Sequence, residues 1–128
     1  MAIFREYLTE SGSLIFAGKN AANNEALIKQ VEPEEEVFHT DEVGSPFVNI
    51  KGKPRRGAIK QAAIFCAAYS KDWKKNQGDV LIHKFKGKNI FKEKTMKTGT
   101  FGVKKFTRIK VKKIEILNFL KKQQEEKV

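Results

Sequence analysis

Ala58-Ile59-Lys60-Gln61-Ala62-Ala63-Ile64-Phe65-Cys66-Ala67-Ala68-Tyr69 is the stretch of this chain that decides its fold. Nearly every position in it is apolar or small, which is typical of a helix that is buried on most of its surface. Alanine favours helix formation, and its short side chain lets a helix lie close to a neighbouring layer. We therefore predict a buried helix from Ala58 to about Trp73, packed against a β-sheet.

Short apolar segments separated by turn residues surround this helix and predict strands. Asn20, Asn23 and Asn24 offer N-cap side chains for an earlier helix over about residues 20–31, and Pro33 follows that helix and stops it. The segment from about 113 to 128 has apolar residues at helical spacing and predicts a helical tail. The predicted strands cover residues 4–9, 14–17, 37–40, 47–50, 80–85, 90–92 and 106–112.

The order of these elements favours an α+β fold in a single domain of residues 1–128. Strands joined by short turns predict a largely antiparallel sheet, with the helices at about 20–31 and 58–73 packed on one face and a C-terminal helix. The other face is then partly free. The last strand alternates strictly, so Phe106, Arg108, Lys110 and Lys112 are expected together on one face of the sheet.

The composition predicts a folded protein rather than a disordered or membrane-spanning one. Hydrophobic residues make up 40% and charged residues 32% of the chain, and no segment approaches the roughly 20 apolar residues of a bilayer span. The N-terminus carries no basic-then-apolar leader. The single cysteine, Cys66, can form neither an internal disulfide nor a cysteine-based zinc site. We expect a cytoplasmic protein.

Charge is divided unevenly along the chain. Residues 1–50 hold three basic and nine acidic residues, a formal charge of −6, whereas residues 51–128 hold 23 basic and six acidic residues, a formal charge of +17. Clustered lysines neutralise phosphates and release their counterions, so this division is typical of a polyanion-binding protein. The competing interpretation is a general bias toward lysine, which would be expected to raise glutamate as well.

Two basic segments are candidates for contact with RNA. Loop 52–57 precedes the N-terminus of the long helix, where unpaired N–H groups favour anions. Segment 84–113 holds twelve Lys or Arg residues and one acid, and phenylalanines on which bases could stack lie between them. The alternative is that the lysines only face solvent and the rings only fill the core. The predicted RNA-binding residues are Lys53, Arg55, Arg56, Lys84, Lys86, Lys88, Lys92, Phe101, Phe106, Arg108, Lys110 and Lys112.

Residues suited to catalysis are scarce. His39 and Asp41 have a spacing that could place both beside a metal ion, but His-x-Asp alone is a weak signal, and His39 and His83 are the only histidines. Ser45 lacks the flanking glycines of a nucleophile elbow, and no glycine-rich nucleotide-binding loop occurs. We therefore predict a protein that is not an enzyme and holds no metal and no cofactor.

Five short motifs run in order along nearly the whole chain. They are Gly18-Lys19-Asn20 with Asn23-Asn24-Glu25-Ala26-Leu27; Glu36-Val37-Phe38-His39; Gly44-Ser45; Ala62-Ala63 with Ala67-Ala68-Tyr69-Ser70; and Lys88-Asn89-Ile90-Phe91-Lys92 with Lys97-Thr98-Gly99-Thr100-Phe101. In this order they resemble the NFACT RNA-binding domain, the C-terminal module of ribosome-associated quality-control factors, which also occurs as short stand-alone proteins. The motif residues that we single out are Gly18, Lys19, Asn20, Asn24, Phe38, His39, Gly44 and Ser45.

The resemblance implies RNA binding, to rRNA or tRNA, in translation or ribosome-associated quality control, with the large ribosomal subunit as a candidate partner. Lys19 stands where the family has Arg, and Pro46 stands where it commonly has His after Gly-Ser, which removes a polar group. The family's other modules are not matched, so the addition of residues to stalled nascent chains is not carried over. Whether DNA binds as well, and whether the chain self-associates, stays open.

Two other classes of function compete with RNA binding. The first is a protein–protein adaptor that docks a basic partner or a second copy through the acidic residues of 1–50 and the C-terminal helix. The second, a hydrolase or metal enzyme, rests on His39 and Asp41 alone. The charge division and the alternation of lysine with phenylalanine favour RNA binding over both.

Overall fold

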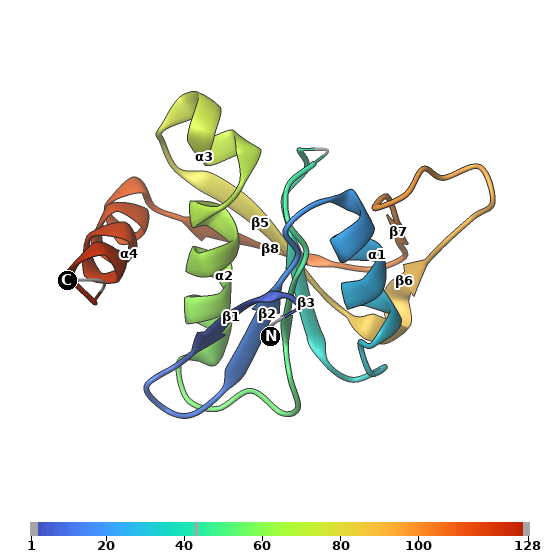
Figure 1. Ribbon diagram of the computed structural model, residues 1–128, viewed down its shortest axis with the longest axis horizontal. Helices are drawn as coiled ribbons and strands as arrows, with labels where there is room; N and C mark the ends of the chain where they lie inside the picture. The colour runs from blue at the N-terminus through green and yellow to red at the C-terminus, as the bar shows by residue number, and fades with distance from the viewer. Residues whose placement is uncertain (1–2, 43, 127–128) are drawn as a thin grey trace.

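The computed structural model describes residues 3–42 and 44–126, and its centre is a six-stranded antiparallel sheet (Figure 1). The strands of this sheet are β1 (Arg5–Leu8), β2 (Leu14–Ala17), β3 (Glu36–His39), β4 (Val48–Ile50), β5 (Val80–Lys86) and β8 (Thr107–Val111). They lie in the order β1-β2-β4-β3-β5-β8. After β5 come a short 3-10 helix, η1 (Gly87–Asn89), and a separate hairpin of β6 (Ile90–Phe91) and β7 (Gly102–Val103).

Four α-helices occur in the described residues: α1 (Ala21–Lys29), α2 (Ala58–Ala68), α3 (Lys71–Asn76) and α4 (Lys113–Glu126). The helix predicted at 58–73 is therefore two helices. Ser70 separates them, because its Oγ donates to the Ala67 carbonyl oxygen at 2.7 Å and accepts from the Trp73 N–H at 3.1 Å, which caps α3. None of the helices in residues 3–42 and 44–126 combines the length and hydrophobicity needed to cross a membrane.

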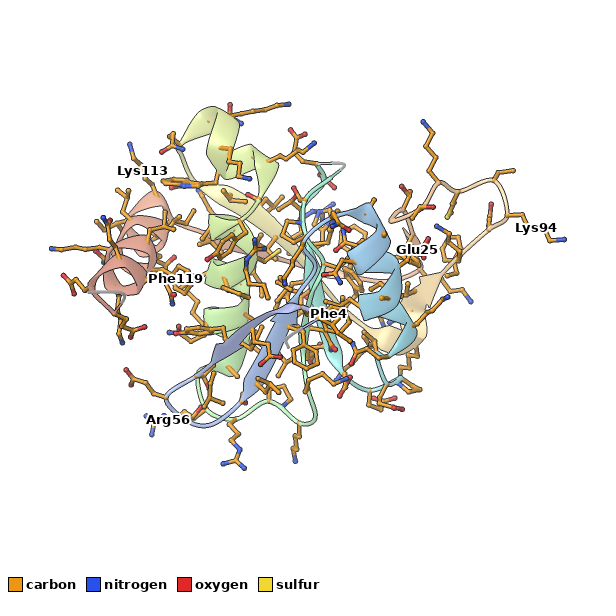
Figure 2. All side chains as sticks on the ribbon, in the orientation of Figure 1. Phe4, Glu25, Arg56, Lys94, Lys113 and Phe119 are labelled. Carbon is orange, nitrogen blue, oxygen red and sulfur yellow. The ribbon has the colours of Figure 1, made fainter. Side chains whose placement is uncertain are left out.

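Helix α2 packs on one face of the sheet, with α4 beside it (Figure 1). Ala62 and Ala63 are fully buried, so the backbone of α2 comes close to the central strands β3 and β4. Helix α4 contributes Ile116 and Phe119 to the same apolar cluster (Figure 2), in which the Phe119 ring meets the edge of Tyr7 from β1. The prediction of a buried helix against a sheet is confirmed, as are the α+β class, the largely antiparallel sheet and the C-terminal helix.

Helix α1 lies on the opposite face of the sheet, so the prediction that it shares a face with residues 58–73 was wrong. Its Leu27 is fully buried and clusters with Val37 and Phe85, whereas Phe38 clusters with α2. Neighbouring residues of a strand point to opposite faces. Because both Val37 and Phe38 are large and apolar, β3 needs a cover on each side.

The alternation predicted for β8 is confirmed. Ile109 and Val111 face α2 and its apolar cluster, while Arg108 and Lys110 are exposed on the other face. Part of that second face, around Val37 and Phe85, is covered by α1 and by the β6–β7 hairpin (Figure 1). The expectation of a partly free sheet face is therefore met over the β5–β8 edge.

The close approach of α2 predicts that a larger side chain at Ala63 destabilises the fold. Ala63→Leu should lower the free energy of unfolding by about 1–3 kcal/mol, because the site has no room for the added atoms. Urea unfolding followed by the fluorescence of Trp73, the only tryptophan and 5% exposed, measures this effect. Ala26→Leu on the exposed side of α1 is the matched control; equal stability of the two variants would contradict the prediction.

Candidate nucleic-acid interface

The uncovered part of the second sheet face is formed by β5 and β8. Their register places Leu81 opposite Lys110 and His83 opposite Arg108, so these four side chains share one face. Leu81 is 41% exposed, although it is apolar and lies within the sheet. We call this surface the open half-face, and it comprises Leu81, His83, Phe106, Arg108 and Lys110, together with the exposed Lys112 directly after the end of β8.

Three side chains of the open half-face are stacked. The centroid of the Phe106 ring lies 4.4 Å from that of His83 with 29° between the planes, and Arg108 Cζ lies 5.2 Å from the Phe106 centroid. Phe106 is nevertheless 38% exposed. Such an arrangement places an aromatic surface for a nucleobase beside a guanidinium for a phosphate.

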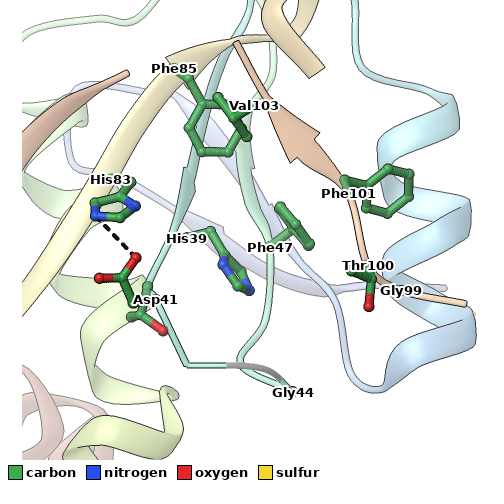
Figure 3. Close-up of a pocket in the computed structure, with 11 residues that line it drawn as sticks. His39, Asp41, Gly44, Phe47, His83, Phe85, Gly99, Thr100, Phe101 and Val103 are labelled. Atoms are coloured by element: carbon green, nitrogen blue, oxygen red, sulfur yellow. Dashed lines mark ion pairs between the residues drawn. The ribbon is translucent and has the colours of Figure 1, made fainter. Parts of the chain in front are cut away.

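A hollow of about 220 Å³ adjoins this stack (Figure 3), and we call it the histidine hollow. The His39 ring stacks on Phe47 at 4.1 Å with 19° between the planes, and the Phe101 ring meets Phe47 edge-on at 5.5 Å. A flat aromatic group such as a base fits a site built from ring faces. The side chains around it include those of His39, Asp41, Phe47, His83, Phe85 and Phe101.

The two histidines of the hollow have different surroundings. His39 Nε2 lies 3.0 Å from the Ser45 carbonyl oxygen, to which it donates, and burial lowers the pKa of His39, so its imidazole is neutral at pH 7. His83 Nε2 lies 3.4 Å from Asp41 Oδ1, but this buried nitrogen has no partner in hydrogen-bond geometry in the described chain. The hollow is therefore bordered by a buried polar nitrogen that has no hydrogen bond in the described residues.

His39 and Asp41 do not form a metal centre with further ligands. Each has a different partner, Ser45 for His39 and His83 for Asp41, and the Asp41 side chain is 81% exposed. Within residues 3–42 and 44–126 no group of three or more metal-ligating side chains occurs. The absence of a metal and of a cofactor stays a prediction.

Four of the lysines predicted to contact RNA share their charge with acids from the first part of the chain. Lys84 and Lys86 Nζ lie 3.4 and 3.3 Å from the carboxylate of Glu36, which is buried, and Lys88 lies 3.0 Å from Glu34. The fourth is Lys92. Ion pairing makes these lysines less available to a phosphate than Arg108 or Lys112 on the open half-face, whose third cation, Lys110, lies 3.7 Å from Asp79.

Lys92 fixes the loop that forms one wall of the hollow. Its Nζ lies 2.6 Å from Glu25 Oε1 and donates to the carbonyl oxygens of Lys97 and Thr100 at 2.6 and 2.8 Å. The hydrogen bond from Lys92 also lowers the pKa of Glu25. The same ammonium lies 4.6 Å from the centroid of Phe101, which is half-buried rather than exposed.

The basic loop at 52–57 lies apart from the open half-face. Its Arg55 N–H donates to Ser13 Oγ at 2.9 Å, so the loop packs on the turn between β1 and β2. Lys53, Arg55 and Arg56 are exposed there. Strand β4 has the 40–47 loop at its start and the 52–57 loop at its end, so the two loops lie at opposite ends of the sheet.

Comparison with known proteins places this chain in a family. The family model of the NFACT protein RNA-binding domain matches residues 3–105. The chain belongs to this family. The RNA-binding class predicted from the sequence is thus confirmed at the level of the NFACT domain, while the individual contact residues stay predictions.

Two longer proteins are similar to this NFACT domain, one in sequence and one in fold. It is 32% identical over 95 residues to the archaeal Rqc2 homolog aRqcH of Methanocaldococcus jannaschii, a match that covers 71% of this chain and 14% of that protein. It shares its fold with the C-terminal part of the fibronectin/fibrinogen-binding protein from Streptococcus suis, at a TM-score of 0.78 and 22% identity, over 92% of this chain and 49% of the solved one.

The motif residues of the NFACT domain join α1 to the loop that carries the hollow. Asn24 is 4% exposed, its Oδ1 accepts from the Phe47 N–H at 3.2 Å, and its Nδ2 donates to the Ser45 carbonyl oxygen at 3.4 Å. A Cβ at Gly18 would lie 1.8 Å from Asn24 Oδ1, so only glycine leaves room for this side chain. The motif thus positions Phe47 under His39.

The remaining motif residues also have structural roles. Asn20 Oδ1 accepts from the Asn23 N–H at 2.8 Å and caps α1. Phe38 is fully buried against α2, and Ser45 Oγ accepts from the Lys71 N–H at 3.1 Å. Lys19 and Gly44 are exposed and lie near Asn24, at the contact between α1 and the loop that precedes β4.

Sequence reasoning missed Phe47, His83 and Phe85 as members of the site. All three lie in predicted strands, where a phenylalanine or a lone histidine usually indicates packing within the fold rather than ligand contact. Only the register, in which His39 is paired with His83, brings them to one hollow. The sequence shows one histidine in each of the two strands, His39 and His83, but no local pattern in it indicates that these strands are neighbours.

The hydrogen bonds of Asn24 to the Ser45 and Phe47 backbone predict that Asn24→Ala lowers the stability of the fold. This change leaves the buried Phe47 N–H without its acceptor and should cost about 1–3 kcal/mol of unfolding free energy. Asn118→Ala on the exposed surface of α4 should change stability by no more than about 0.5 kcal/mol. Chemical denaturation of both variants tests the difference, and an unaffected Asn24→Ala protein would refute the structural role of the motif.

Proposed function

We propose that this domain binds structured RNA of the translation machinery, rRNA or tRNA, in ribosome-associated quality control. Its family is one of RNA-binding domains, and the longer relative from Methanocaldococcus jannaschii is named as an Rqc2 homolog. The large ribosomal subunit is the partner that this setting suggests. The role is non-catalytic and cytoplasmic in this proposal, and it requires neither metal nor cofactor.

The stack of Arg108, Phe106 and His83 at the rim of the histidine hollow is the observation that carries the proposal. Sequence-tolerant RNA binding combines cations for the phosphates with ring faces for the bases. In this stack the two kinds of group lie on one exposed sheet face. The hollow behind it has ring walls, which suit an unstacked base.

The adaptor alternative loses part of its basis in the structure. Seven acidic residues of the first fifty lie within ion-pair distance of a basic group or a histidine, so less of their charge is available to dock a basic partner. They are Glu10, Glu25, Glu34, Glu35, Glu36, Asp41 and Glu42. Ile114 and Leu117 on α4 are exposed, at 59% and 42%, and are what remains of a protein-docking surface.

The phosphate contacts of the open half-face predict a weaker salt dependence after charge reversal. Arg108→Glu/Lys110→Glu/Lys112→Glu should lower RNA affinity and reduce the log–log salt slope by about 1 for each phosphate that is no longer neutralised. Filter binding to a structured RNA at several salt concentrations measures both quantities. The matched control reverses Lys113, Lys121 and Lys122 on α4; equal decreases in affinity and slope in the two triple variants would mean that only net charge matters.

Stacking on Phe106 predicts a loss of affinity with little change in salt slope. Phe106→Ala should weaken RNA binding by about 1–3 kcal/mol, because the base loses its ring partner while the phosphate contacts stay. Leu117→Ala removes a side chain of similar exposure from α4 and should leave the affinity unchanged. RNA binding by Phe106→Ala at wild-type strength would remove the stack from the interface.

A further inference from the structure

We infer that a second basic site holds one backbone phosphate of the bound RNA, an inference that rests on the proposed function. The site is a pocket of about 100 Å³ where the start of α1 meets α3 and the 40–47 loop. We call it the lysine cleft after four cations that line it, Arg5, Lys19, Lys71 and Lys74. None of them is among the residues that the sequence predicted to contact RNA.

The positive charge of the lysine cleft is not balanced by acidic residues in its lining. Its lining includes the four cations and no carboxylate. None of the four takes part in an ion pair within residues 3–42 and 44–126, whereas the adjacent Lys75 lies 3.7 Å from Glu42. Most lysines of β5 and its following loop are paired with acids, so the cleft differs from them in having charge available for an external anion.

Arg5 is held in place at the wall of the cleft. Its Cζ lies 4.2 Å from the centroid of the Tyr69 ring, and its Nη1 donates to the Gly18 carbonyl oxygen at 3.5 Å. A guanidinium has five N–H donors, and this contact uses one of them. The others are available to the oxygens of a phosphate, for which the planar guanidinium is well suited.

Lys71 reaches the cleft across Gly44. A Cβ at Gly44 would lie 2.7 Å from Lys71 Nζ, and Gly44 has a φ of +88°, so a side chain at this position would both strain the backbone and displace the ammonium. Lys74 follows three residues later on α3 and therefore lies on the same side of that helix. The glycine of the Gly44-Ser45 motif thus keeps space for a cation.

The position of the cleft favours RNA over a free anion as its ligand. Gly44 lines both the lysine cleft and the histidine hollow, so the two sites lie on either side of the same loop. The N-terminus of α1, capped by Asn20 at the cleft, adds the positive end of a helix dipole. A strand with a base in the hollow passes this loop, and the cleft then holds a phosphate of the same strand.

The test removes two cleft charges and compares the salt dependence of RNA binding. Lys71→Gln/Lys74→Gln should lower the log–log salt slope by about 0.7–0.9 for each phosphate that the cleft no longer neutralises. The ratio of wild-type to variant affinity should then fall about three-fold between 50 and 200 mM salt for each such phosphate. Lys113→Gln/Lys121→Gln on α4 removes the same charge elsewhere, and Lys71→Arg/Lys74→Arg should keep the wild-type slope.

The outcomes separate this inference from the proposed function. A reduced slope in the Lys71→Gln/Lys74→Gln protein alone supports the cleft. If the wild-type domain binds RNA but the two glutamine variants show equal salt slopes, the inference of a phosphate site in the lysine cleft is wrong, and the open half-face remains the proposed interface. If the wild-type domain binds neither rRNA nor tRNA, the proposed function fails and the RNA ligand of the cleft fails with it. Circular dichroism of each variant shows whether weaker binding reflects a loss of folding. If the glutamine variant is misfolded, the arginine variant provides the test, because a reduced salt slope in the folded Lys71→Arg/Lys74→Arg protein would contradict the inference.

Discussion

The small side chains of α2 let that helix lie close to β3 and β4, and the other elements are arranged around this contact. Because α2 and α4 together cover one face of the sheet, the second face has to be closed only where its residues are apolar. Helix α1 and the β6–β7 hairpin do this over Val37 and Phe85. Toward β8 the sheet carries polar and charged residues on this side, and it stays open to a ligand.

The available positive charge also lies on the parts of the surface that stay open to a ligand. The acidic first part and the basic second part of the chain are not separate regions in space, because Glu25, Glu34 and Glu36 pair with lysines of β5 and the segment after it. The excess of positive charge therefore remains where acids are absent from the neighbourhood. The lysine cleft and the Arg108 end of the open half-face are two such places.

Most strands and helices could be predicted from the sequence because they depend on local periodicity, but the break at Ser70 and the short strand β7 (Gly102–Val103) were not predicted. The alternation of β8 even identified the exposed side chains, Arg108 and Lys110, correctly. The face on which α1 packs depends instead on the register of strands distant in sequence, which no local pattern contains. The histidine hollow needs rings from three segments, and whether Lys92 is paired depends on Glu25, 67 residues earlier.

Lys92 also has a consequence for the energetics of recognition. A loop of this length without secondary structure would normally have to become ordered when a ligand binds, at a cost in conformational entropy. Here the Lys92 ammonium holds the loop between β6 and β7 in place without a ligand, because it pairs with Glu25 of α1 and donates to two carbonyl oxygens of the loop. The wall of the hollow is therefore preorganised, and binding energy that would otherwise order the loop contributes to affinity instead.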